Sequence, residues 1–262
     1  MRTMKRVAAV ALSVVVLMTS GVSAKAAVTD VQPAKSSSEA VLKWAKKVGE
    51  PFDEKTYANN TVSKIKLVGN YLYVADDAKH RIMKIDTKDG TILKEQKYYD
   101  ESYIQGYVSS IGYGDNKVYV GYDNGRVQAF DENTLESLWI TDENKNAINA
   151  DFVFTNGKLY FGTTAKTTDW YDNGAPFSYY VVTTSDDDKT KPDEEKTMKK
   201  VVESKTGKFY SKKGVVLGKY IVISDTAGTL TMIDTTMDRQ THIWHTQLSL
   251  DSTINKLNGT MH

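Results

Sequence analysis

The densest group of side chains suited to recognition lies between residues 169 and 180. This stretch interleaves tryptophan, tyrosine and phenylalanine with aspartate, asparagine and glycine. Trp and Tyr offer rigid rings that carry a polar atom, which suits contacts with a protein or a sugar. We predict that five residues form a ligand-binding site: Trp170, Tyr171, Asp172, Phe177 and Tyr179. The alternative is a hairpin whose aromatic rings fold back on the body of the protein.

Motifs for catalysis or metal binding are missing from the sequence. The chain has no cysteine, which removes thiolate nucleophiles, thiolate metal sites and disulfides. The charged run from Asp186 to Lys196 lacks the spacing of a calcium loop and predicts a solvated hairpin tip. His242 and His245 lie on an expected strand at a separation that puts their side chains on opposite faces. We therefore expect no catalytic residue, no metal ligand and no cofactor.

The N-terminus has the three-part layout of a secretory signal. Arg2, Lys5 and Arg6 precede an apolar run from Val7 to Met18, and small residues follow as far as Ala26. The run is shorter than the roughly 20 residues of a membrane span. We predict a signal peptide over residues 1–26, a flexible leader over 27–38, and a secreted chain that is not inserted in the membrane.

Charge gives no reason to expect binding to nucleic acid. Lys and Arg number 34 and Asp and Glu 33, which gives a formal net charge of +1. A nucleic-acid-binding surface needs a strong basic excess. Removal of the signal would take away basic residues and leave a slightly acidic chain, so we expect no nucleic-acid partner.

A short pattern, apolar-Tyr-apolar beside a Gly or Asn turn, recurs along the rest of the chain. The copies lie at residues 70–74, 116–121, 157–162 and 218–223. In most copies a second short strand follows and ends in an aspartate, at Asp86, Asp131 and Asp234. Strands joined by Asn-Gly type turns predict antiparallel hairpins.

Each repeat contains enough short apolar segments for four strands. Val74, Val120, Phe161 and Val222 mark equivalent positions with spacings of 46, 41 and 61 residues. Four-stranded units of this length are typical of propeller blades. The sequence therefore predicts an all-β fold, a β-propeller of four-stranded antiparallel blades, over residues 39–262.

Two sets of aromatic residues recur in step with the repeat. The tryptophans are Trp44, Trp139 and Trp244, and the tyrosines are Tyr73, Tyr119 and Tyr160. A residue that recurs with the structural unit usually packs between units. We expect these residues to pack between blades, with the tyrosines at least half buried.

The pattern Tyr-Val-Gly, hairpin, apolar-Asp and then Trp resembles the PQQ-like β-propeller repeat of secreted bacterial surface proteins. The stretch from Lys117 to Trp139 matches best; Gly90 supplies the glycine of the motif in the first unit, and Leu135 replaces it in the second. The third unit lacks the segment from Asp to Trp. The resemblance implies seven or eight blades in a whole ring. Catalytic members hold a quinone and a calcium ion in a complete ring, commonly with a disulfide, and we do not expect that chemistry here.

The four units do not close a ring. Val41–Ala45 resembles the outermost strand of a blade, and residues 252–261 resemble a first strand with its turn. We expect about four blades plus partial strands, with open sheet edges. Either the chain self-associates through those edges or, as the resemblance favours, the protein continues beyond His262.

These observations predict a secreted, non-catalytic binding scaffold at the bacterial cell surface or in the cell wall, with a protein or a glycan as its partner. The alternative is a metal-dependent hydrolase. Tyr73–Asp76 resembles blades of secreted lactonase-like hydrolases. That resemblance implies metal-binding carboxylates or histidines at the central channel.

Overall fold

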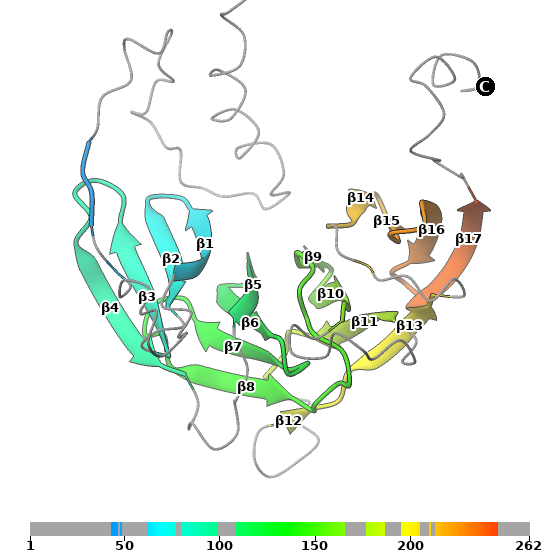
Figure 1. The fold of residues 1–262 in the computed structure, drawn as a ribbon, viewed down its shortest axis with the longest axis horizontal. Helices are drawn as coiled ribbons and strands as arrows, with labels where there is room; N and C mark the ends of the chain where they lie inside the picture. The colour runs from blue at the N-terminus through cyan, green and yellow to red at the C-terminus, as the bar shows by residue number, and fades with distance from the viewer. Residues whose placement is uncertain are drawn as a thin grey trace, which may run out of the picture.

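The computed structural model describes residues 43–46, 48, 62–76, 80–98, 108–165, 177–186, 195–204, 210 and 213–245. In these ranges every regular element is a β-strand, and the strands form four sheets set side by side in an open arc (Figure 1). The incomplete four-blade propeller expected from the sequence is confirmed. Among the described residues, no helix is long and apolar enough to span a membrane. The predicted signal peptide and leader, residues 1–38, lie outside the described residues.

Each blade places its first strand on the inner side of the arc and its last strand outside (Figure 1). Blade 1 contains β1 (Val62–Val68), β2 (Tyr71–Asp76), β3 (Arg81–Asp86) and β4 (Ile92–Lys97). Blade 2 contains β5 (Val108–Gly114), β6 (Lys117–Tyr122), β7 (Val127–Asp131) and β8 (Ser137–Thr141). Blade 3 contains β9 (Val153–Thr155), β10 (Lys158–Gly162), β11 (Ser178–Thr183) and β13 (Lys199–Glu203). Blade 4 contains β14 (Val215–Leu217), β15 (Tyr220–Ser224), β16 (Thr229–Asp234) and β17 (Arg239–His245).

Two details of the predicted strands need correction. Residues 43–45, the described part of the outermost strand expected at Val41–Ala45, form no strand. A short extra strand, β12 (Glu195–Lys196), leaves blade 3 and pairs in parallel with β8 on the outer edge of blade 2. The first-strand pattern expected at residues 252–261 lies outside the described residues.

The turn between the third and fourth strands is fixed by its aspartate. Asp86, Asp131 and Asp234 each accept the amide two residues ahead on Oδ1, at 2.7, 2.8 and 2.9 Å. Asp readily caps its own turn in this way. In blade 3, Thr183 takes the register position of the aspartate. The next residue, Thr184, still donates its amide to Gly157 at 2.9 Å, as Glu132 does to Asn116 in blade 2.

The fifth residue of the aspartate turn has a left-handed backbone. Its φ is 76° at Gly90, 61° at Leu135 and 48° at Asp238. A glycine suits this position, which explains the motif that the sequence suggested. Leu135 adopts the conformation at a cost of about 1 kcal/mol, and its side chain is completely buried between blades 1 and 2. Packing of the leucine therefore compensates the strain of its backbone.

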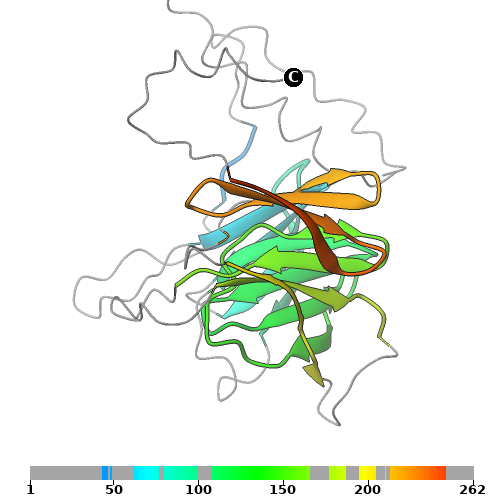
Figure 2. The same cartoon turned by 90° about the vertical axis from the view of Figure 1, so that its right-hand side faces the viewer.

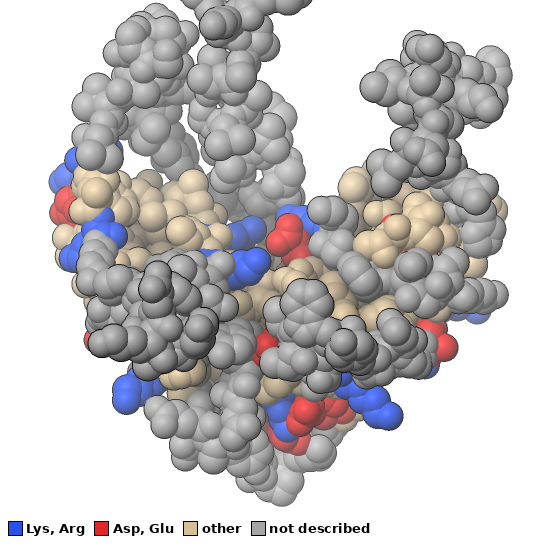
Figure 3. Space-filling model, viewed as in Figure 1, with Lys and Arg blue, Asp and Glu red and all other residues tan. Residues whose placement is uncertain are grey.

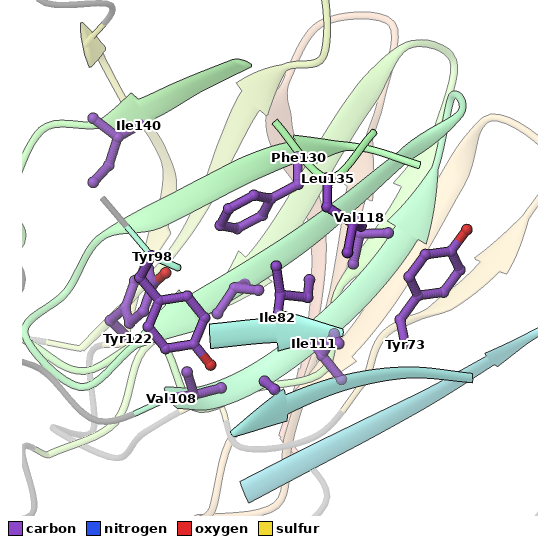
Figure 4. Packing of buried hydrophobic residues seen from close by; sticks show 12 residues of the cluster. Tyr73, Ile82, Tyr98, Val108, Ile111, Val118, Tyr122, Phe130, Leu135 and Ile140 are labelled. Atoms are coloured by element: carbon purple, nitrogen blue, oxygen red, sulfur yellow. The ribbon is translucent and has the colours of Figure 1, made fainter. Parts of the chain in front are cut away.

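The apolar side chains form one layer between each pair of neighbouring blades. Tyr73 and Ile82 of blade 1 meet Val118 and Phe130 of blade 2 (Figure 4). Equivalent clusters join blade 2 to blade 3 and blade 3 to blade 4. Figure 2, which turns the molecule by 90°, shows the sheets stacked face to face. Each central blade thus buries both of its faces.

Aromatic side chains also connect the blades by hydrogen bonds to the aspartate turns. Tyr73 Oη donates to the Glu132 carbonyl of blade 2 at 3.0 Å. In blade 3, Tyr160 Oη donates to Asp238 Oδ1 of blade 4 at 2.6 Å and lies 3.4 Å from the Thr235 carbonyl. Ahead of blade 1, Trp44 Nε1 donates to the Thr87 carbonyl at 2.8 Å. In each case the aromatic side chain reaches the carbonyl of the residue after the turn aspartate, Thr87, Glu132 or Thr235. The same position of the repeat therefore contacts the element that precedes the blade.

Replacing these hydroxyls tests the bonds between blades. Tyr73→Phe should lower the free energy of unfolding by about 1 kcal/mol, and Tyr160→Phe by about 2 kcal/mol because a carboxylate is among its acceptors. Urea denaturation measures both values. Tyr220→Phe, at a partly exposed ring, is the control and should change little; equal effects of the three substitutions would contradict this account.

Substitutions at Leu135 test the compensation between strain and packing. Leu135→Ala should cost about 3 kcal/mol through the cavity it leaves. Leu135→Gly should be no less stable than Leu135→Ala, because glycine relieves the left-handed backbone. At the equally buried Leu159, on a regular strand, glycine should be clearly worse than alanine. Thermal melting of the four variants measures their stability. If glycine were less stable than alanine by the same amount at both positions, the backbone strain at Leu135 would be disproved.

Candidate interaction surface

The connections between strands divide the arc into a side with long loops and a side with tight turns. The second-to-third strand connections and the links between blades lie on one side, called here the loop face. Its longer segments are residues 142–152, 163–177 and 204–214. The opposite side carries the aspartate turns, the tight first hairpin turns and, in blade 3, the connection from β11 to β13 with the second insertion. Binding residues commonly sit on long loops held by a rigid scaffold.

The aromatic insertion predicted as the ligand site leaves the loop face from a fixed base. Thr163 N donates to the Ser178 carbonyl at 3.0 Å, and Ser178 N donates to Thr163 Oγ1 at 2.9 Å. Thr163 Oγ1 also donates to the Ser178 carbonyl at 3.0 Å. The intervening Trp170, Tyr171 and Asp172 lie outside the described residues. The described part of the insertion is therefore its closed, hydrogen-bonded base.

Phe177 and Tyr179 do not offer contact surface to a ligand. Phe177 is buried, and Tyr179 is completely buried between blades 3 and 4, with its ring edge against Tyr210 at 5.8 Å between centroids. On the other face of the same strand, Tyr180 stacks on Phe161 at 6.3 Å. The expectation of a ligand-binding role is corrected for these two residues: Phe177 is buried just ahead of β11, and Tyr179 lies on β11, in the middle of a blade whose two faces are both covered.

The repeated aromatic positions lie where packing between blades requires them. Tyr73, Tyr119, Tyr160 and Trp139 are buried. Trp44 lies over Gly90, where an added Cβ would come within 2.8 Å of its ring. Trp244 belongs to β17, and its side chain is not among those that the structure describes. Burial raises the pKa of Tyr119 above its usual value, so this phenol stays protonated near neutral pH.

The second insertion contributes a buried anchor to the neighbouring blade. Lys196 is only 2% exposed; its Nζ lies 4.8 Å from the centre of the Trp139 ring and donates to the Thr183 carbonyl at 2.7 Å. Arg126 Nη1 donates to Glu195 Oε1 at 2.9 Å. The described end of this insertion is thus no solvated hairpin tip, because the lysine stem and the ion pair hold it on blade 2. Residues 187–194 lie outside the described residues.

Charged side chains gather on the inner side of the arc (Figure 3). Lys66 comes from β1, Lys213 directly precedes blade 4 and Asp151 precedes β9. Burial lowers the pKa of Lys66, Lys213 lowers it further, and Asp151 opposes the shift. The first strand of blade 1 and the segments that lead into blades 3 and 4 therefore bring charges of both signs within electrostatic range of one another.

The acid of Tyr73–Asp76, the segment behind the hydrolase alternative, is already paired. Asp76 is fully buried and its Oδ2 lies 3.0 Å from Arg81 Nε. Arg81 also donates to Glu95 at 2.6 Å and to the Val48 carbonyl at 3.1 Å. Across the residues that the structure describes, no group of three His, Cys, Asp or Glu side chains could hold a metal ion.

Large apolar side chains are exposed on the first strands at the two ends of the arc. Ile65 and Leu67 on β1 are 60% and 42% exposed, and Val215 and Leu217 on β14 are 59% and 54% exposed. Neighbouring exposed apolar residues of this size mark interaction surfaces more often than isolated ones do. The sequence analysis singled out neither of these two rows.

Comparison with known proteins supports the fold alone. No family model and no curated protein matches the chain. The β-propeller domain of Cps50 (Swd1) from Myceliophteria thermophila is 9% identical with a TM-score of 0.51, covering 72% of this chain and 55% of that one. The computationally designed Ika8 protein is 12% identical with a TM-score of 0.50, covering 71% and 50%. A quinohemoprotein alcohol dehydrogenase from Pseudomonas putida HK5 is 14% identical with a TM-score of 0.50, covering 70% and 34%. The chain thus spans about half or less of the length of these propellers.

Removing the Lys196 ammonium tests the anchor of the second insertion. Lys196→Met keeps the apolar stem but loses the hydrogen bonds and the contact with Trp139, so the free energy of unfolding should fall by about 2 kcal/mol. Thermal denaturation measures the loss. Lys199→Met, at a side chain that is 60% exposed, should cost less than about 0.5 kcal/mol. If the two variants were equally stable, β12 would have no anchoring role.

Proposed function

We propose that this chain is a secreted, non-catalytic β-propeller scaffold that binds a protein or a glycan at the bacterial cell surface or cell wall. The observation that carries the proposal is the aromatic insertion with its hydrogen-bonded base at Thr163 and Ser178. A rigid blade below the base lowers the entropy that a loop would lose on binding. Trp170 and Tyr171 supply the aromatic contact surface, and Asp172 supplies a hydrogen-bond acceptor.

Three ion pairs that connect strands or blades favour a scaffold over an enzyme. Arg81 pairs with Asp76, Arg126 with Glu195, and Lys158 with Asp238 at 2.8 Å. Catalytic acids and bases are commonly perturbed groups that face a cleft. In these three pairs each charge has a partner on another strand or blade, which is the arrangement of a structural ion pair.

Binding to cell-wall material tests the proposal. The purified secreted chain should sediment with isolated bacterial cell walls, and Trp170→Ala with Tyr171→Ala should weaken this binding at least about 10-fold, because two hot-spot aromatics contribute at least about 1.4 kcal/mol. The melting temperature of the variant should stay within about 2 °C of the wild type. Binding that survives both substitutions would contradict the assignment of the insertion as the site.

Tyr179 provides the contrasting variant, because its ring is in the core. Tyr179→Ala should lower the melting temperature sharply, since it removes a completely buried aromatic side chain.

The hydrolase alternative predicts that the chain binds calcium or zinc tightly and hydrolyses a lactone. Either of those two results would overturn the non-catalytic proposal, whatever the cell-wall experiment shows.

A further inference from the structure

The exposed apolar rows at the two ends of the arc lie on opposite faces of their blades, one facing away from blade 2 and the other away from blade 3. Ile65 pairs with Val74, and Val74 packs on the side of blade 1 that Trp44 approaches, away from blade 2. Val215 pairs with Val222, on the side of blade 4 opposite to Ile221, which packs toward blade 3. Residues paired across a sheet share a face. The row of Ile65 and Leu67 is therefore on a face that would contact a preceding blade. The row of Val215 and Leu217 is on a face that would contact a following blade.

The interior of the chain shows how two such faces are covered. First strands of neighbouring blades lie in contact, β1 with β5, β5 with β9 and β9 with β14. Val222 occupies the register position of Tyr73, Tyr119 and Tyr160 in the other blades. Those three tyrosines are buried under the next blade, whereas Val222 remains partly exposed. Blade 4 thus exposes the face that, in each of the other three blades, is covered by the next blade.

We propose that a second copy of this chain covers that face, with β14 of one copy docked head to tail on β1 of the other. The two exposed rows, Val215 with Leu217 and Ile65 with Leu67, belong to complementary faces of the same chain, so a second copy supplies the missing face at each end. Four blades also span about half of the Ika8 and Swd1 propellers. Two copies related by a two-fold axis would form two such contacts and leave neither row exposed.

The outer part of the face on blade 1 already has an occupant. Trp44 and Val48 pack against the cluster of Val74, Met83 and Ile85. Beside this occupied part, Ile65 and Leu67 on β1 remain exposed, as Val215 and Leu217 do on β14 of blade 4. Contact between the two first strands needs no change in the position of Trp44.

The mass of the secreted chain in solution is the first test. Light scattering on a sizing column should give a two-fold mass at micromolar concentration and above. Val215→Glu with Leu217→Glu should return the mass to that of one chain. Leu93→Glu, at a side chain 43% exposed on the outer strand β4, is the matched control and should leave the two-fold mass unchanged. Circular dichroism confirms that each variant is folded. A single-chain mass at all concentrations for the wild type overturns the proposal.

Cysteine cross-linking tests the head-to-tail arrangement, because the natural chain has no cysteine. A mixture of an Ile65→Cys chain and a Val215→Cys chain should form covalent pairs with a short bismaleimide. Each variant alone should form far fewer. Efficient cross-linking of the Val215→Cys chain with itself would show that equivalent faces pair, and would overturn the head-to-tail contact. A two-fold mass that persists in Val215→Glu with Leu217→Glu would also overturn it, by placing the contact elsewhere.

Discussion

A blade of this fold has two apolar faces and cannot bury both of them without a neighbour on each side. The packing layer between adjacent sheets is therefore the interaction on which the rest of the structure depends. Three such layers lie inside the arc, and each contains the recurring tyrosine of the earlier blade. Hydrogen bonds from Tyr73 and Tyr160 to the aspartate turns fix the position of the next blade. Stability in such a repeat protein is a property of neighbouring pairs of units.

The same constraint separates scaffold residues from recognition residues. Side chains that face a neighbouring blade, such as Tyr179 and Trp139, are completely buried and can only pack. Surface for binding is left in three places: the loops that leave the sheets, the inner side with Lys66 and Asp151, and the faces at the two ends of the arc. The aromatic insertion is rooted in the first of these places. The outer edge of blade 2 is covered because β12 pairs with β8.

Periodicity made most of the fold predictable from the sequence. The Asn and Gly turns and the aspartates at Asp86, Asp131 and Asp234 identified the hairpins, because those residue types are selected by local backbone geometry. Long-range contacts were not visible in the same way. The burial of Tyr179 depends on blades on both sides of it, and the pairing of Lys196 with blade 2 depends on Trp139, which lies far away in the sequence. The exposed rows could have been suspected from Val222, where the repeat lacks its tyrosine.

Native-state hydrogen exchange measured strand by strand tests the dependence of blades on their neighbours most directly. At a dilution where light scattering gives the mass of one chain, the amides of β15 in blade 4 should exchange faster than those of β6 and β10. These two strands occupy the same place in blades that are covered on both faces, and strands with less burial open at lower free energy. Equal protection of β6, β10 and β15 would contradict the claim that packing between blades, rather than each sheet alone, stabilises this protein.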